Sequence, residues 1–69
     1  MSHDKIVHMA NQIATFFNSQ PEEERAAGVA NHINKFWERR MREQFFRHLE
    51  NGAEFHPLVK AAASLVNKP

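Results

Sequence analysis

The sequence has 69 residues, of which 42% are hydrophobic and 25% charged, and its formal net charge is +1. This length predicts a single domain over residues 1–69, and the absence of cysteine excludes disulfides, thiolate metal sites and cysteine nucleophiles. No apolar run approaches the ~18 residues of a membrane span, and no signal-peptide pattern is visible, so we expect a cytoplasmic protein without a membrane segment.

The first half of the sequence predicts two helices. Apolar residues recur at steps of three and four from Ile6 to Phe17, which predicts a first helix over residues 2–18 with Ser2 as its N-cap. Residues 18–21 have the composition of a turn, and Pro21 is expected at the first position of a second helix. The acidic residues at positions 22–24 suit the positive end of that helix dipole, so we interpret them as a helix start rather than as a metal site.

The predicted second helix has one apolar face and an unusual glycine. Its face comprises Ala26, Val29, Ala30 and Ile33, followed by Phe36 or Trp37. Gly28 costs the helix ~1 kcal/mol relative to alanine. A close backbone approach by the first or the third helix would explain it, although the sequence is equally compatible with a harmless surface glycine.

From Trp37 onward the apolar residues are spaced at steps of four up to Leu49. Four residues turn a helix by ~400°, so a stripe running unbroken from Ile33 to Leu49 would wind almost half way around one straight helix. We therefore expect a break or a bend near residues 37–40. A glycine at position 52 is expected to end the third helix.

A last, short helix is expected to start at Pro57. Its predicted apolar face consists of Leu58, Val59, Ala62, Leu65 and Val66. The fold class predicted from the sequence is thus all-α, a small helical domain of three longer helices plus a short C-terminal helix.

The sequence does not indicate an active site. Of the five histidines, His3 and His8 lie five residues apart and His48 and His56 lie eight apart, so none forms the i, i+4 pair of a helical zinc site. Serine and threonine lack a nucleophile-elbow turn, and two isolated glycines cannot form a phosphate loop. We assign no catalytic, cofactor-binding or metal-binding residue.

Residues 35–42 (Lys-Phe-Trp-Glu-Arg-Arg-Met-Arg), which we call the basic segment, are the most unusual part of the sequence and allow three interpretations. Trp37 and Met41 could belong to the core, with the arginines on a solvated face. Bases of a single-stranded nucleic acid could stack on Trp37, although residues 35–47 carry only five basic against two acidic residues. Tryptophan, methionine and arginine are also enriched in protein interfaces.

The chain also resembles a known family. The residues that carry the resemblance are Val7, the runs at 9–14 and 16–17, Pro21 with the glutamates at 22–24, the run at 28–30, His32, Ile33, Phe36, Trp37 and the run at 40–42. They are similar to the small delta subunit of bacterial NAD-dependent, molybdenum-containing formate dehydrogenases over nearly the whole chain. A proline commonly stands in that family where this chain has Arg39.

The resemblance implies a non-catalytic accessory subunit of a soluble cytoplasmic complex. The larger subunits of such complexes hold the molybdenum cofactor, iron–sulfur clusters and flavin, and they convert formate and NAD to carbon dioxide and NADH. The delta subunit is expected to bind no cofactor itself and to dock on the large molybdenum-containing catalytic subunit. The contact residues that we expect are Phe36, Trp37, Arg40, Met41 and Arg42. The alternative is a helical nucleic-acid-binding or regulatory module that uses residues 35–47.

Overall fold

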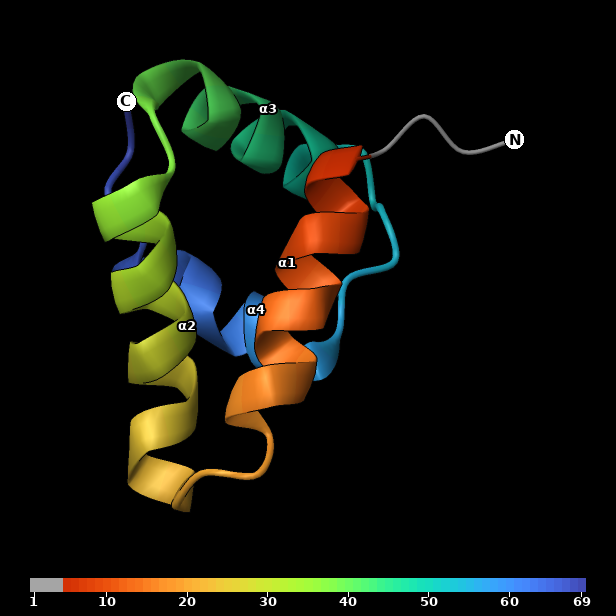
Figure 1. The fold of residues 1–69 in the computed structure, drawn as a ribbon. Coiled ribbons are helices and arrows are strands. Elements are labelled where there is room, and N and C mark those ends of the chain that lie inside the picture. The colour runs from red at the N-terminus through yellow and green to blue at the C-terminus, as the bar shows by residue number, and fades with distance from the viewer. Residues whose placement is uncertain (1–4) are drawn as a thin grey trace.

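The computed structural model describes residues 5–69, which form an all-α fold (Figure 1). The helices are α1 (Lys5–Phe17), α2 (Glu22–Phe36), α3 (Arg39–Glu50) and α4 (Pro57–Ala62), and a 3₁₀ turn, η1 (Ala63–Leu65), follows α4. The predicted fold class of three longer helices and a short C-terminal one is confirmed. The predicted N-cap Ser2 lies outside the described residues. None of the helices in residues 5–69 has the length and apolar character needed to cross a membrane.

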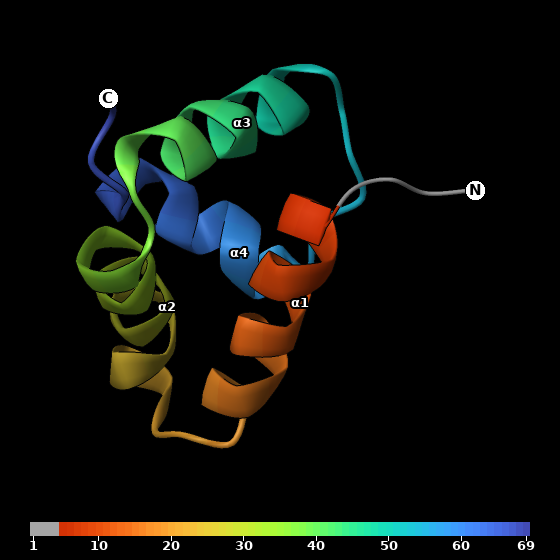
Figure 2. The ribbon, with the colours of Figure 1, turned by 45° about the horizontal axis from the view of Figure 1, so that its top comes forward.

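The first two helices form an antiparallel hairpin on which the other helices pack. α3 lies across the end of the hairpin where α1 begins and α2 ends, and α4 packs against one side of both helices (Figures 1 and 2). Several buried positions are alanines, which let the helix backbones approach closely. The buried core consists of Ile6, Ala10, Ala14, Val29, Ala30, Ile33, Trp37, Phe45, Phe55, Val59, Ala62 and Val66.

The turn between α1 and α2 differs by one residue from the prediction. Pro21 was expected at the first helical position, but it is the N-cap of α2, with φ −53° and ψ 145°. The three glutamates at 22–24 occupy the first turn of α2, as the sequence predicts. Proline suits the N-cap because the helix requires no hydrogen bond from its nitrogen.

The predicted break between α2 and α3 is confirmed. Trp37 ends α2 with an extended backbone (φ −90°, ψ 128°), and its N–H donates to the Ile33 carbonyl at 2.9 Å. Glu38 is also extended, and α3 begins at Arg39. Position 39 is thus the first residue of a helix, which is a site that proline favours and which agrees with the proline common there in the resembled family.

A Schellman motif ends α3, as the glycine at position 52 predicts. Gly52 has a positive φ of 78°, and its N–H donates to the Leu49 carbonyl at 3.2 Å. The next N–H, of Ala53, donates to the His48 carbonyl at 3.0 Å. These two bonds satisfy carbonyls at the end of the helix that would otherwise lack a partner.

Two asparagines attach the C-terminal part of the chain to the hairpin. Asn11 in α1 accepts a hydrogen bond from the His56 N–H at 2.7 Å, and its amide donates to the Glu54 carbonyl at 3.3 Å. Asn34 in α2 accepts from the Asn67 N–H at 2.7 Å and donates to the Leu65 carbonyl at 3.1 Å. These bonds fix the short α4 between its two attachment points.

The last helix starts at Pro57 as predicted, but its apolar face is only partly correct. Val59, Ala62 and Val66 are buried. Leu65 was predicted to be buried with them and is 52% exposed. The α-helix ends at Ala62 and Leu65 lies in the 3₁₀ turn η1, so the α-helical spacing on which the prediction rested does not extend to Leu65.

Gly28 is explained by the side chain of Phe17, which is neither the close backbone approach nor the harmless surface glycine that the sequence allowed. A Cβ atom built on Gly28 would lie 2.5 Å from ring carbons of Phe17. Phe17 therefore packs its ring on the surface of α2 at the position that lacks a side chain.

We predict that Gly28→Ala lowers the free energy of unfolding by up to about 2 kcal/mol. The clash with the Phe17 ring, typical of overpacking at ~1–3 kcal/mol, outweighs the ~1 kcal/mol gained in helix propensity. Urea unfolding followed by circular dichroism measures the change. In a Phe17→Ala background, the same substitution is expected to stabilise by about 0.5–1 kcal/mol, and an unchanged sign there would show that the contact with Phe17 is not the cause.

Candidate functional site

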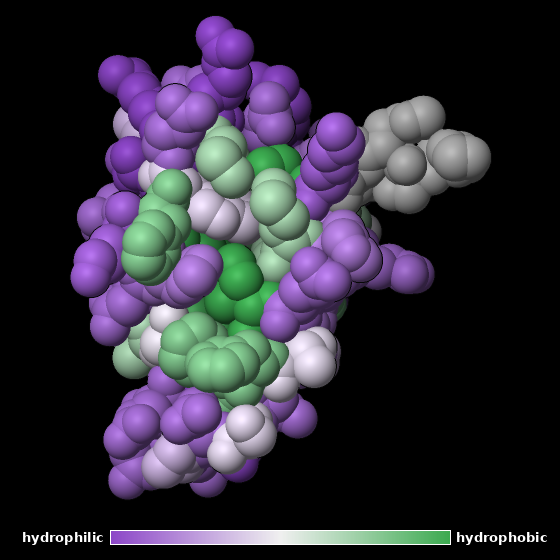
Figure 3. All heavy atoms as spheres, viewed as in Figure 1, coloured by the Kyte–Doolittle hydropathy of each residue, from purple (hydrophilic) through white to green (hydrophobic). Residues whose placement is uncertain are grey.

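An open apolar groove lies between α1 and α2, on the side of the hairpin that faces the viewer in Figure 1. Figure 3 shows this face as a hollow with a hydrophobic floor between polar edges. The cavity has a volume of about 480 Å³. Its lining residues are Met9, Gln12, Ile13, Phe16, Phe17, His32 and Trp37. We call it the α1/α2 groove.

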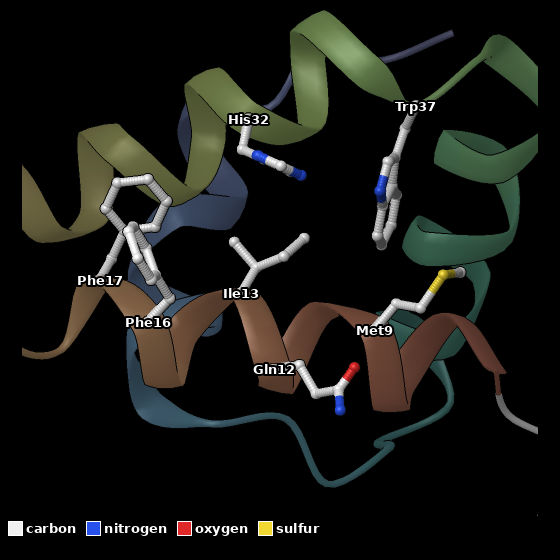
Figure 4. A pocket seen from close by; sticks show the side chains of 7 residues that line it. All are labelled: Met9, Gln12, Ile13, Phe16, Phe17, His32 and Trp37. Atoms are coloured by element: carbon white, nitrogen blue, oxygen red, sulfur yellow. The ribbon is translucent and has the colours of Figure 1, made fainter.

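Aromatic side chains stand at both ends of the groove. In Figure 4, the rings of Phe16 and Phe17 stand at one end, Trp37 stands at the other, and Ile13 points into the space between them. Phe16 and Phe17 contact each other edge to face, with ring centroids 5.0 Å apart. Phe16 is 64% exposed, because consecutive helical residues are rotated by ~100° and only Phe17 can reach α2.

Two polar side chains line the groove, and one of them connects it to the basic segment. These are Gln12 from α1 and His32 from α2. The His32 ring lies 4.8 Å from the Phe36 ring, one helical turn further along α2. Lys35 Nζ lies 5.7 Å from the centroid of the Phe36 ring. The apolar groove and the start of the basic segment therefore form one continuous surface.

The structure separates the two aromatic residues of the basic segment. Phe36 is 65% exposed, whereas Trp37 is 6% exposed. The Trp37 ring packs edge to face on Phe45, with centroids 6.0 Å apart, and also closes one end of the groove. Trp37 therefore belongs to the core. The sequence left open whether Phe36 or Trp37 extends the buried face of α2, and in the structure it is Trp37.

The three other predicted contact residues lie in three different environments. Arg40 is exposed on the first turn of α3. Met41 is half-buried and packs against the core. Arg42 is half-buried, and its Nη1 donates to the Asn67 carbonyl at 2.9 Å. Its Nε is buried and, among the described residues, has no hydrogen-bond partner.

The burial of Trp37 argues against base stacking on this residue, which the nucleic-acid alternative assumed. Stacking of bases requires an accessible aromatic face, and the Trp37 ring does not offer one in this fold. The nearby Arg39 also forms an ion pair with Glu43, with Nε and Oε2 3.5 Å apart. Trp37, on which the base-stacking interpretation rested, is thus part of the core.

The described histidines take structural or surface positions. His56 caps α4, because its Nδ1 accepts a hydrogen bond from the Leu58 N–H at 3.0 Å. His32 lies against Phe36 at the groove. Across residues 5–69, no group of three or more histidine, cysteine, aspartate or glutamate side chains is placed to hold a metal ion.

Of the residues that line the groove, the sequence analysis named only Trp37 as a contact residue. Gln12, Phe16 and His32 were not singled out as site residues. A signal was present, because Phe16 lies one residue off the buried stripe and His32 and Phe36 form an i, i+4 aromatic pair on α2. The pairing of α1 with α2, which makes the groove, is not visible in either helix alone.

One protein-family model matches residues 5–63 of the chain, and its description is the delta subunit of NADH-dependent formate dehydrogenase, FdsD. The match covers most of the chain, including both walls of the groove and the whole basic segment. The chain therefore belongs to the FdsD family, as its resemblance to formate dehydrogenase delta subunits implied. No curated protein matches it.

We predict that Trp37→Ala lowers the free energy of unfolding by about 3–5 kcal/mol. The substitution removes a buried aromatic ring from the contact with Phe45, and such a loss is a large part of the total stability of a small domain. Thermal unfolding followed by circular dichroism measures the effect. Trp37→Phe is the matched control and is expected to cost less than half as much; a Trp37→Ala protein as stable as the original would show that this ring is not part of the core.

Proposed function

We propose that this chain is a non-catalytic delta subunit of a cytoplasmic, molybdenum-containing, NAD-dependent formate dehydrogenase. In this proposal it docks on the large catalytic subunit and supports the assembly or the stability of that subunit. The observation that carries the proposal is the FdsD family match, which covers the residues of an exposed surface suited to protein contact. The larger subunits, and not this chain, supply the redox centres and convert formate and NAD to carbon dioxide and NADH.

The residue types of the chain support a non-catalytic role. Iron–sulfur clusters are held by cysteine thiolates, and this sequence contains no cysteine. Its two glycines are isolated, whereas nucleotide-binding loops need several glycines in a short motif. The chain is therefore better suited to bind another protein than to carry a step of the reaction.

The contact that we propose is made through the basic segment. Phe36 and Arg40 are exposed, so they are the direct contacts in this proposal. Trp37, Met41 and Arg42 face inward and contribute by holding the segment against the core and the C-terminal residues. An exposed phenylalanine beside arginines is a composition typical of interface hot spots.

We predict that Phe36→Ala and Arg40→Glu each lower recovery of the chain with the large subunit while leaving its helicity unchanged. Truncating or reversing a desolvated charge at an interface costs ~2–5 kcal/mol, which corresponds to at least about a 30-fold loss of affinity. An exposed charge of this kind contributes only ~0–1 kcal/mol to folding. Affinity co-purification and circular dichroism of the two variants measure the two effects.

The matched control is Lys60→Glu, which reverses an exposed cation on α4, away from the basic segment. This variant is expected to co-purify normally. An Arg40→Glu protein that binds the large subunit as well as the Lys60→Glu control would place the interface elsewhere. Formate-dependent NADH production by the purified chain alone would contradict the non-catalytic role.

We further expect the chain to be present in an equimolar amount in the mature, cofactor-loaded enzyme. A permanent subunit is retained after cofactor insertion, whereas an assembly factor is released. Quantitative mass spectrometry of enzyme purified with and without molybdenum in the growth medium measures the ratio. Enrichment of the chain on the cofactor-free enzyme would assign it a transient role in assembly.

A further inference from the structure

We infer that the α1/α2 groove receives an amphipathic helix of the large subunit, with apolar side chains in the groove and acidic residues at the end next to Trp37. The inference rests on the proposed function and specifies which surface and which kind of partner segment it uses. Three features of the groove carry it: its lining, its length and the distribution of charge at its two ends.

The lining is predominantly apolar and accessible. Met9, Ile13 and Phe16 come from successive turns of α1, and Trp37 closes the groove opposite Phe16. Phe16 is largely exposed, whereas Ala14, two residues earlier, is buried. Filling the groove would remove this apolar surface from water at ~25 cal/mol per Å².

The length of the groove matches two turns of a helix. Met9 and Phe16 are seven residues apart in α1, which corresponds to ~10.5 Å at 1.5 Å per residue. A docked helix places anchors at positions i, i+3 or i+4, and i+7 over the same distance. The groove is therefore suited to three apolar anchors of one partner helix.

The two ends of the groove carry opposite charge. At the Trp37 end lie Lys35, beside the exposed Phe36 ring, and Arg40, at the start of α3. Glu43 lies in α3 as well, but it is paired with Arg39. The exposed Glu38 follows Trp37, so Lys35, Glu38 and Arg40 together carry a net charge of +1 (two basic against one acidic residue). At the opposite end lies the start of α2, where three consecutive glutamates at 22–24 and Arg25 give a net charge of −2 (one basic against three acidic residues). A partner helix with carboxylates at the Trp37 end would meet cations there and avoid the glutamates, which fixes its direction in the groove.

A cysteine-labelling experiment tests whether the groove is covered in the complex. The chain has no cysteine of its own, so Gln12→Cys introduces a single thiol at the groove and Ala61→Cys introduces one at an exposed position of α4. Each variant is assembled with the larger subunits, treated with a maleimide and analysed by mass spectrometry of the small chain. We expect labelling at position 12 to be at least 10-fold slower in the complex than in the isolated chain, and labelling at position 61 to change by less than twofold.

The outcomes separate this inference from the proposed function. If the wild-type chain does not co-purify with the larger subunits, the proposed function fails. If the equimolar complex forms and position 12 is labelled at the same rate as in the isolated chain, the inference is overturned while the proposed function stands. Protection of position 12 in the isolated chain that increases with its concentration would show that a second copy occupies the groove, and would also overturn the inference.

A second set of variants tests the apolar and charged contacts separately. Phe16→Asp places a charge in the groove, and Leu65→Asp is its control at an exposed leucine outside the groove. Lys35→Glu reverses the charge at the Trp37 end, with Lys60→Glu as its control. We expect Phe16→Asp and Lys35→Glu each to lower recovery with the large subunit at least 10-fold at unchanged helicity, and the two controls to bind normally. Normal binding of Phe16→Asp would overturn the groove as the docking site, and normal binding of Lys35→Glu would overturn the proposed direction of the helix.

Discussion

The packing of Trp37 determines how the two halves of this small domain meet. Its backbone ends α2, and the extended residues that follow turn the chain into α3 across the end of the hairpin. Its ring then packs on Phe45, which also contacts Phe55 in the loop before α4. The same ring forms an end wall of the α1/α2 groove. One side chain thus couples the helix break, the core and the candidate interface.

Much of the fold follows from local signals in the sequence. The break before Arg39 could be predicted because a stripe with four-residue steps cannot stay on one face of a straight helix, and the end of α3 because glycine adopts a positive φ at low cost. The attachment of α4 could not be predicted. It depends on hydrogen bonds from Asn11 and Asn34 to backbone more than thirty residues away, and an asparagine in a helix gives no local sign of such a partner.

The candidate site was harder to predict for a geometric reason. Residues 35–42 are neighbours in sequence, but they span the end of α2, two extended residues and the start of α3. Phe36 and Arg40 point outward, while Trp37 and Arg42 turn toward the rest of the chain. In the groove, by contrast, residues that are distant in sequence lie close together in space, as Ile13 and His32 do. A sequence segment rich in interface residue types therefore mixes residues that face the solvent with residues that hold the fold.

One side of the α1/α2 hairpin is covered by α4, whereas the other side exposes the groove. This difference relates the stability of the fold to partner binding. On one side, α4 covers α1 and α2 and is held there by hydrogen bonds from both helices (Figures 1 and 2). On the other side, the groove exposes apolar side chains that adjoin the same core. A helix seated in the groove, as we infer, would bury Ile13 and the exposed Phe16 ring more deeply. Because such a ligand binds only the folded chain, its binding free energy adds to the free energy of unfolding, by ~2.7 kcal/mol when the free partner is at 100 times its Kd. In a domain whose core is this small, the partner that occupies the groove would then supply a substantial share of the stability of the folded state.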